Sequence, residues 1–127
     1  MVLAVGDDAT GKSSTIAYQS EQTFIAAGVP FFYPRSTHDI IRMGLHAFAL
    51  SRAAGCCVGM KIVVDTVYTS SVIDLNTIRP PHFDGDNDLT SEDFGPVHIG
   101  LHEPALKRED RLYNLRLPAV LRYQQIQ

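Results

Sequence analysis

The chain has 127 residues, of which 45% are hydrophobic and 20% are charged, and its formal net charge is −3 at pH 7. These proportions are typical of a single soluble globular domain, and the dispersed lysines and arginines give no support for binding nucleic acid or an anionic membrane. No apolar run reaches the roughly 20 residues that a membrane-spanning helix needs, and the N-terminus lacks the pattern of a secretion signal. We therefore expect a cytoplasmic protein that binds neither nucleic acid nor membrane.

The first two predicted elements are a strand and a helix joined by a polar loop. Residues 2–5 (VLAV) are short, apolar and β-branched, and they predict a strand that ends at Gly6. After the loop at 6–15, residues 16–27 carry enough apolar positions to predict a helix, which Gly28 ends.

The next two elements are a short strand and the best-marked helix of the chain. Residues 30–34 (PFFYP) predict a short buried strand between prolines. Ser36 followed three residues later by Asp39 resembles a capping box, and apolar residues at helical spacing follow up to Gly55. Thr37–Ala54 is therefore predicted as a helix with a broad apolar face.

A third apolar run completes a repeating strand–helix pattern. Residues 57–65 (CVGMKIVVD) predict a strand that helices bury on both faces. The alternation predicts an α/β fold over residues 1–77, with a partial parallel sheet and flanking helices. The loops at 6–15, 34–37 and 65–71 would then lie at the carboxyl ends of the strands, where α/β proteins bind ligands.

The two cysteines, Cys56 and Cys57, are adjacent in this third run. A disulfide between neighbours is strained, and an iron–sulfur cluster takes about four ligands, so neither is expected here. We expect two small buried side chains in a reducing compartment.

The remainder of the chain has a different texture. Residues 78–100 are rich in Pro, Gly and Asp and predict an irregular acidic loop. Within it, residues 84–95 resemble a calcium-binding loop but lack the required glycine and the final glutamate, so we expect a solvated surface loop. Residues 101–127 predict a C-terminal amphipathic helical segment, kinked or broken near Pro118.

The loop after the first strand carries the most informative motif. GDDATGKS matches the P-loop pattern G-x-x-x-x-G-K-[ST], in which backbone amides hold phosphates, Lys12 reaches them and Ser13 binds magnesium. Against this reading, Asp7 and Asp8 place two carboxylates where a polyphosphate would bind. No metal-ligand spacing links the histidines, and no histidine is paired with the hydroxyls of this loop by a motif.

Three segments together resemble a known family. VGDDATGKSSTIAYQSEQTF, AAGVPFFYP and GLHAFALSRAAGCCVGMKIVVDTV look like indolepyruvate ferredoxin oxidoreductase and, more broadly, the thiamine-diphosphate-dependent 2-oxoacid:ferredoxin oxidoreductases. The likeness runs from Val2 to about Val72 and continues more weakly into LKREDRLYNLRLPAVL. It implies the second half of a pyrimidine-binding domain. Family loops usually have a small residue other than glycine where Gly11 stands, and that departure creates the P-loop match.

The resemblance implies an activity for a full enzyme, not for this chain alone. Such an enzyme oxidatively decarboxylates an aryl 2-oxoacid to acyl-CoA and passes electrons to ferredoxin, using thiamine diphosphate with magnesium and iron–sulfur clusters. The glutamate that acts on the aminopyrimidine ring, the diphosphate-binding domain and the cluster ligands are not in this sequence. We expect the isolated chain to be inactive and without cofactor, and to need the rest of the oxidoreductase or a second subunit.

A narrow sheet that begins inside its first strand further predicts that the chain associates, as a homo-oligomer. We expect Asp7, Asp8, Lys12, Ser13 and Ser14 to line the cofactor or substrate cleft, with no metal site and no catalytic residue identified. An equally weighted interpretation is that Asp8 and Lys12 pair and fix the shape of the loop. Two alternative functions stay open: a small P-loop nucleotide-binding protein and a non-catalytic interaction module.

Overall fold

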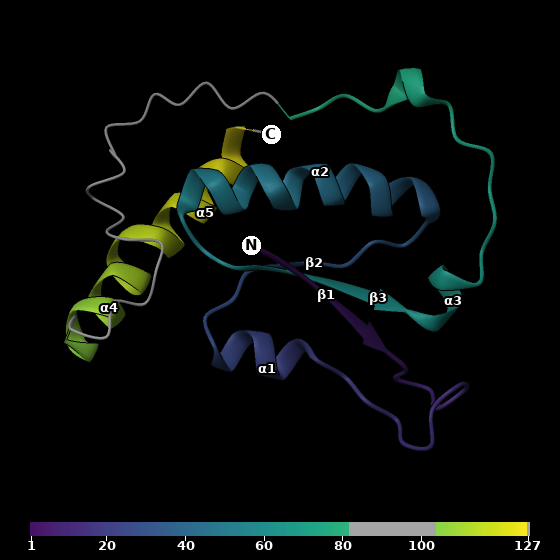
Figure 1. Ribbon diagram of the computed structural model, residues 1–127, viewed down its shortest axis with the longest axis horizontal. Coiled ribbons are helices and arrows are strands. Elements are labelled where there is room, and N and C mark those ends of the chain that lie inside the picture. The colour runs from purple at the N-terminus through teal and green to yellow at the C-terminus, as the bar shows by residue number, and fades with distance from the viewer. Residues whose placement is uncertain (82–103, 127) are drawn as a thin grey trace.

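The computed structural model describes residues 1–81 and 104–126 and has an α/β architecture. A three-stranded parallel sheet lies between α1 on one face and α2 on the other (Figure 1). The strands are β1 (Val2–Asp7), β2 (Phe31–Phe32) and β3 (Val58–Val63). The helices are α1 (Glu21–Ala26), α2 (Thr37–Ala54), α3 (Val64–Val67), the 3-10 turn η1 (Leu75–Thr77), α4 (Ala105–Arg111), the π segment η2 (Leu112–Arg116) and α5 (Leu117–Ile126).

The predicted parallel sheet is confirmed, and its strand order is β1-β3-β2. β3 is the central strand and pairs with β1 from Val2↔Val58 to Asp7↔Val63. It pairs with β2 through Phe31↔Gly59 and its neighbour. Because β1 and β3 are neighbours, the loop after β1 and the helix α3 after β3 meet at the same end of the sheet.

The predicted helix α2 is confirmed at both ends. The Ser36 hydroxyl accepts the Asp39 amide at 3.1 Å, as an N-cap should. In a capping box the Asp39 carboxylate would in return accept the amide of Ser36. Here it accepts the amide of Arg35, the residue before Ser36, at 3.3 Å. Gly55 ends the helix with φ 61°, a left-handed conformation that glycine adopts without strain.

The core lies on the α2 face of the sheet, between α2, β3 and α5. Its buried residues include Leu50, Val58 and Tyr123, and the Tyr123 hydroxyl is hydrogen-bonded to His46 Nδ1 at 3.0 Å. On the opposite face, Phe24 of α1 stacks on Phe31 of β2 with ring centroids 5.2 Å apart. Both cysteines were expected to be buried. Cys56 is buried, but Cys57 is only half-buried.

The predicted helix over 16–27 is wrong in its first five residues, because α1 spans only Glu21–Ala26. The backbone of residues 13–20 is held by longer-range bonds: Tyr18 forms an isolated bridge with Asp8, and the Ser20 amide donates to Asp7 at 2.9 Å. A helical backbone could not make these contacts, so tertiary bonds override the local helical pattern.

Four further element boundaries differ from expectation. The strand predicted over 2–5 does not end at Gly6 but runs to Asp7, and the strand predicted over 30–34 is only Phe31–Phe32. The strand predicted over 57–65 ends at Val63, and the chain turns at once into α3. The C-terminal segment, expected to be kinked or broken near Pro118, is not broken there: it runs on through α4, η2 and α5, with the π segment η2 ending at Arg116. Proline lacks an amide hydrogen, and its ring crowds the carbonyl one turn earlier, which accounts for a π segment directly before it.

The irregular acidic loop predicted at 78–100 falls mostly outside the described residues, and the calcium-like segment 84–95 lies wholly outside them. No helix within residues 1–81 and 104–126 is both long enough and apolar enough to cross a membrane.

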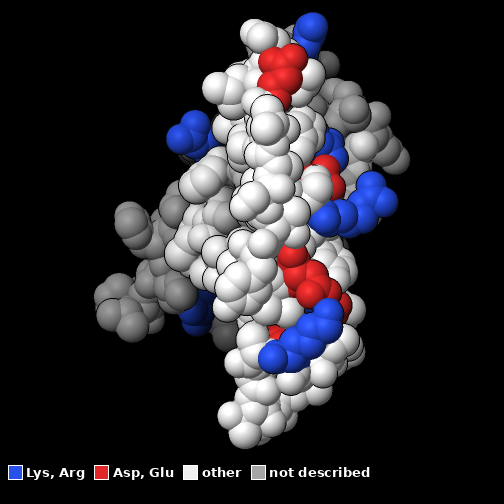
Figure 2. All heavy atoms as spheres, turned by 90° about the vertical axis from the view of Figure 1, so that its right-hand side faces the viewer, with Lys and Arg blue, Asp and Glu red and all other residues white. Residues whose placement is uncertain are grey.

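The outward face of α2 carries a stripe of exposed apolar side chains. Ile41, Leu45 and Phe48 are 37%, 36% and 57% exposed, and we call them the α2 stripe. β1 pairs with another described strand on one side only. Figure 2, which views the molecule from the right-hand side of Figure 1, shows acidic and basic side chains interspersed on that face, without a patch of single sign.

Candidate functional site

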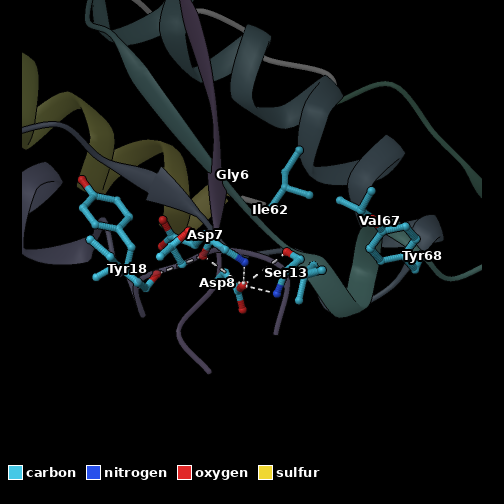
Figure 3. Close-up of a pocket in the computed structure, with 12 residues that line it drawn as sticks. Gly6, Asp7, Asp8, Ser13, Tyr18, Ile62, Val67 and Tyr68 are labelled. Carbon is cyan, nitrogen blue, oxygen red and sulfur yellow. Dashed lines mark hydrogen bonds between the residues drawn. The ribbon is translucent and has the colours of Figure 1, made fainter. Parts of the chain in front are cut away.

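A cavity of about 590 Å³ opens at the carboxyl ends of β1 and β3 (Figure 3). The loop after β1 forms one side, and β3 with α3 forms the other. Its lining residues are Gly6, Asp7, Asp8, Ser13, Ser14, Thr15, Ile16, Tyr18, Ile62, Val64, Val67 and Tyr68. Four of the five predicted site residues therefore line one cavity, and the loop at 34–37 does not contribute.

The carboxylate of Asp8 organises the loop. Its Oδ2 accepts the amides of Ser13 at 2.6 Å and Ser14 at 2.7 Å, and its Oδ1 accepts the amide of Lys12 at 2.9 Å. The hydroxyls of Ser13 and Ser14 also donate to Oδ2, at 3.2 and 3.0 Å. Figure 3 shows Ser13 and Asp8 turned toward each other across this network. Three consecutive amides and two hydroxyls thus converge on one acidic side chain.

This convergence keeps Asp8 ionised. The amide of Ser13 foremost, with those of Lys12 and Ser14, holds the pKa of the Asp8 carboxyl well below its ordinary value of 3.8, although burial opposes the shift. The residue is 7% exposed, at the cavity wall. The cavity therefore carries a fixed negative charge whose lone pairs already accept several hydrogen bonds.

The backbone of Asp8 closes the loop as well. Its carbonyl accepts the amides of Gly11 at 3.1 Å and Tyr18 at 3.2 Å. Gly11 has φ 66°, which favours glycine, so the residue that completes the P-loop pattern also makes a tight turn. Backbone and side chain of Asp8 together fix residues 11–18 against the end of β1.

Lys12 is the predicted site residue that does not line the cavity. Its ammonium pairs with the carboxylate of Asp65 in α3, at 2.9 and 3.1 Å, and both side chains are mostly exposed. The interpretation that Asp8 and Lys12 pair and fix the loop therefore holds for the Lys12 backbone amide but not for its ammonium. Only the backbone amide of Lys12 contacts Asp8, because the ammonium lies within reach of a different carboxylate.

Asp7 belongs to a buried ionic cluster beside the cavity. Its Oδ2 accepts the Ser20 amide and hydroxyl, at 2.9 and 2.8 Å, and lies 3.3 Å from Lys61 Nζ. Lys61 also forms an ion pair with Glu21 at the start of α1, and its Nζ lies 4.6 Å from the ring centroid of Tyr33. The cluster ties the end of β1 to β3 and α1.

The charges of this cluster are mutually dependent. Burial alone would lower the pKa of Lys61, but bonds and charges from Glu21 and Asp7 outweigh it and raise that pKa above 10.5. The hydrogen bond from Lys61 in turn lowers the pKa of Glu21 below 4.5. Asp7 Oδ1 and Glu21 Oε2 are buried and accept no hydrogen bond from the described residues. Two carboxylates thus share one ammonium.

The geometry of the loop differs from a phosphate-binding loop in two ways. The amides that would face a phosphate donate to Asp8, and no helix begins after Lys12 and Ser13, since α1 starts only at Glu21. No lysine or arginine lines the cavity among the described residues. Nor do any three His, Cys, Asp or Glu side chains in this part of the chain gather closely enough to hold a metal ion.

The sequence interpretation missed the apolar side of the cavity. Ile16, Ile62, Val67 and Tyr68 carry no signature that distinguishes a cavity wall from ordinary packing or surface. Lys61 could have been found, because a lysine inside a continuous apolar strand requires a buried counter-charge.

Comparison with known proteins adds no relative: a scan against protein-family models, a search of curated proteins and a search of solved structures each returned no match. We therefore infer a function from the cavity and from the residues that the sequence singled out.

Proposed function

We propose that the chain is part of the pyrimidine-binding domain of an indolepyruvate-type 2-oxoacid ferredoxin oxidoreductase, and that the cavity after β1 contributes to its cofactor or substrate cleft. The observation that supports this most strongly is the gathering of Asp7, Asp8, Ser13 and Ser14, quoted above in the resemblance, around one cavity at the carboxyl ends of neighbouring parallel strands. α/β proteins commonly bind ligands at this edge of the sheet.

The chemistry of the cavity suits a ring rather than an anion. Ile62, Val67 and Tyr68 offer an apolar wall. The charged groups on the opposite wall are the carboxylates of Asp8 and Asp7, and that of Asp7 is paired with Lys61. Burial of apolar surface stabilises binding by about 25 cal/mol per Å², whereas a carboxylate or phosphate would face Asp8 at short range. An uncharged or cationic ring is therefore the favoured occupant.

The described residues fit the ring portion of thiamine diphosphate but not its diphosphate. Bound thiamine diphosphate supplies the carbanion-type chemistry that decarboxylates a 2-oxoacid. Its magnesium and diphosphate need oxygen ligands and cations, which the described residues do not gather. The adjacent pair Cys56–Cys57 is too small a set for an iron–sulfur cluster. These groups would be held by the rest of the enzyme.

An interaction module is the second candidate, and the exposed α2 stripe favours it. This candidate is compatible with the first, because a partial cofactor domain requires a partner to complete its cleft. The P-loop alternative has no comparable support, because Asp8 already accepts the amides it requires.

Saturation-transfer NMR with thiamine, which has the cofactor's rings but no phosphate, tests the proposal. We expect millimolar binding to the wild type, weakened by Val67→Lys, which adds a cation at the cavity. Leu121→Lys is the matched control: Val67 and Leu121 are 62% and 60% exposed, and Leu121 lies in α5 away from the cavity. Absence of binding to the wild type, or equal binding by both variants, would contradict the proposal.

A further inference from the structure

The loop after β1 contains an oxyanion-binding arrangement that the protein fills itself. Consecutive amides of Lys12, Ser13 and Ser14 point at one position, as the amides of a phosphate-binding nest do. That position is occupied by the two oxygens of Asp8, at 2.6 to 2.9 Å from the amide nitrogens. A carboxylate of the chain stands where an external anion would stand in a nest of this kind.

A second, independent contact removes the other attraction for an anion. Lys12 would supply the cation of a phosphate-binding loop, but its ammonium is held by Asp65, a residue of a different element. Asp8 thus accepts the hydrogen bonds of the amides, and Asp65 pairs with the ammonium. The cavity beside them has an apolar wall, and none of the described residues that line it is a lysine or an arginine.

We propose that Asp8 determines the charge selectivity of this cavity: by occupying the amide nest, its carboxylate excludes phosphate and other oxyanions and leaves only uncharged or cationic groups able to bind. Because the contact is intramolecular, Asp8 competes at a high effective concentration with any anion in solution. The inference rests on the proposed function for the identity of the ring that enters. The exclusion of oxyanions stands on the geometry of the loop alone.

Replacing Asp8 should convert the loop into an oxyanion site. In ¹⁵N-labelled protein, the amide signals of Lys12, Ser13 and Ser14 are followed while pyrophosphate is added at constant ionic strength. We expect no saturable shift in the wild type. Asp8→Ala should give saturable shifts at these three amides, with affinity at least about tenfold above the wild type. Asp8→Asn, which keeps the side-chain shape and one acceptor, should give a smaller gain.

Asp65→Asn is the matched control, because it releases the Lys12 ammonium and leaves the nest filled. It should gain no saturable shift at Ser13 and Ser14. The proposal is overturned if the wild type binds pyrophosphate as tightly as Asp8→Ala, or if Asp65→Asn gains as much. It is also overturned if Asp8→Asn, with a native amide spectrum, gains nothing. Failure of thiamine to bind would contradict the proposed function but would leave the pyrophosphate results unchanged. A failure of the proposed function can therefore be told from a failure of the inference about Asp8.

Discussion

Removing the buried lysine of the ionic cluster is the sharpest perturbation of the fold. Lys61→Met leaves the carboxylates of Asp7 and Glu21 without a counter-charge; the Lys61 side chain is 3% exposed, that of Asp7 0% and that of Glu21 26%. Breaking a buried ion pair on one side costs about 3–5 kcal/mol, which is a large part of the roughly 5–15 kcal/mol of a typical domain. Asp7 keeps its two bonds from Ser20, so we expect the lower end of that range.

Equilibrium urea denaturation followed by circular dichroism measures this loss. With a slope of about 2 kcal/mol per M, a loss of about 3 kcal/mol should lower the midpoint by roughly 1.5 M. The matched control is Lys12→Met, because Lys12 also pairs with an aspartate but is 57% exposed, and Asp65 is 71% exposed. An exposed pair contributes about 0–1 kcal/mol, so the control should shift the midpoint little. Equal losses in the two variants would refute the assignment of a buried cluster.

A compensated variant tests the same reasoning from the other direction. Asp7→Asn, Glu21→Gln and Lys61→Met combined remove all three charges and keep the side-chain shapes similar. Uncharged replacements of buried ionic groups are often close to neutral, so the triple variant should recover most of the free energy of unfolding lost by Lys61→Met. If it is no more stable than Lys61→Met, lost packing rather than uncompensated charge explains the effect.

Three further outcomes are expected. Gly59→Ala should destabilise by about 1–3 kcal/mol, because a Cβ there would lie 2.7 Å from a phenyl ring, whereas Gly6→Ala meets nothing within 4 Å and should be near neutral in the same thermal melt. The pKa values of Asp8 and Glu21 are lower in the folded than in the unfolded chain, so both carboxylates stabilise the fold above about pH 4.5. This stabilisation should be lost as the pH falls through the folded pKa values, and the Tm should decrease. The decrease in Tm at acid pH should be smaller for Asp8→Asn. At micromolar concentration, light scattering should show a dimer or higher oligomer of the wild type. Phe48→Glu in the α2 stripe should shift it toward monomer. A monodisperse wild-type monomer with a cooperative melt would contradict the expectation that the chain is part of a larger domain.

The ends of a helix could be predicted from the sequence where a capping residue marks them. α2 was predicted to the residue because Ser36 caps its start and Gly55 its end. The sheet followed from three apolar runs, although the order β1-β3-β2 came only with the structure. The first helix was overextended because Asp7 and Asp8 hold Ser20 and Tyr18 by bonds that no local pattern reveals.

The candidate site was predictable on its polar side only. Asp8, Ser13 and Ser14 were found through the loop that follows the first strand. The pairing of Lys12 with Asp65 joins that loop to α3, and the two meet only after β1 and β3 pair. The P-loop pattern itself says which backbone amides can face an anion. It cannot say that an aspartate four residues before the lysine supplies that anion from within the chain.

Calorimetric titration of one wild-type sample with thiamine and, separately, with magnesium ATP distinguishes a ring-binding cavity from a nucleotide site. We expect weak, millimolar binding of thiamine that does not require magnesium, and no binding of magnesium ATP. A micromolar dissociation constant for magnesium ATP, about 8 kcal/mol of binding free energy, that Lys12→Ala abolishes would contradict it and show that the loop after β1 is a nucleotide site.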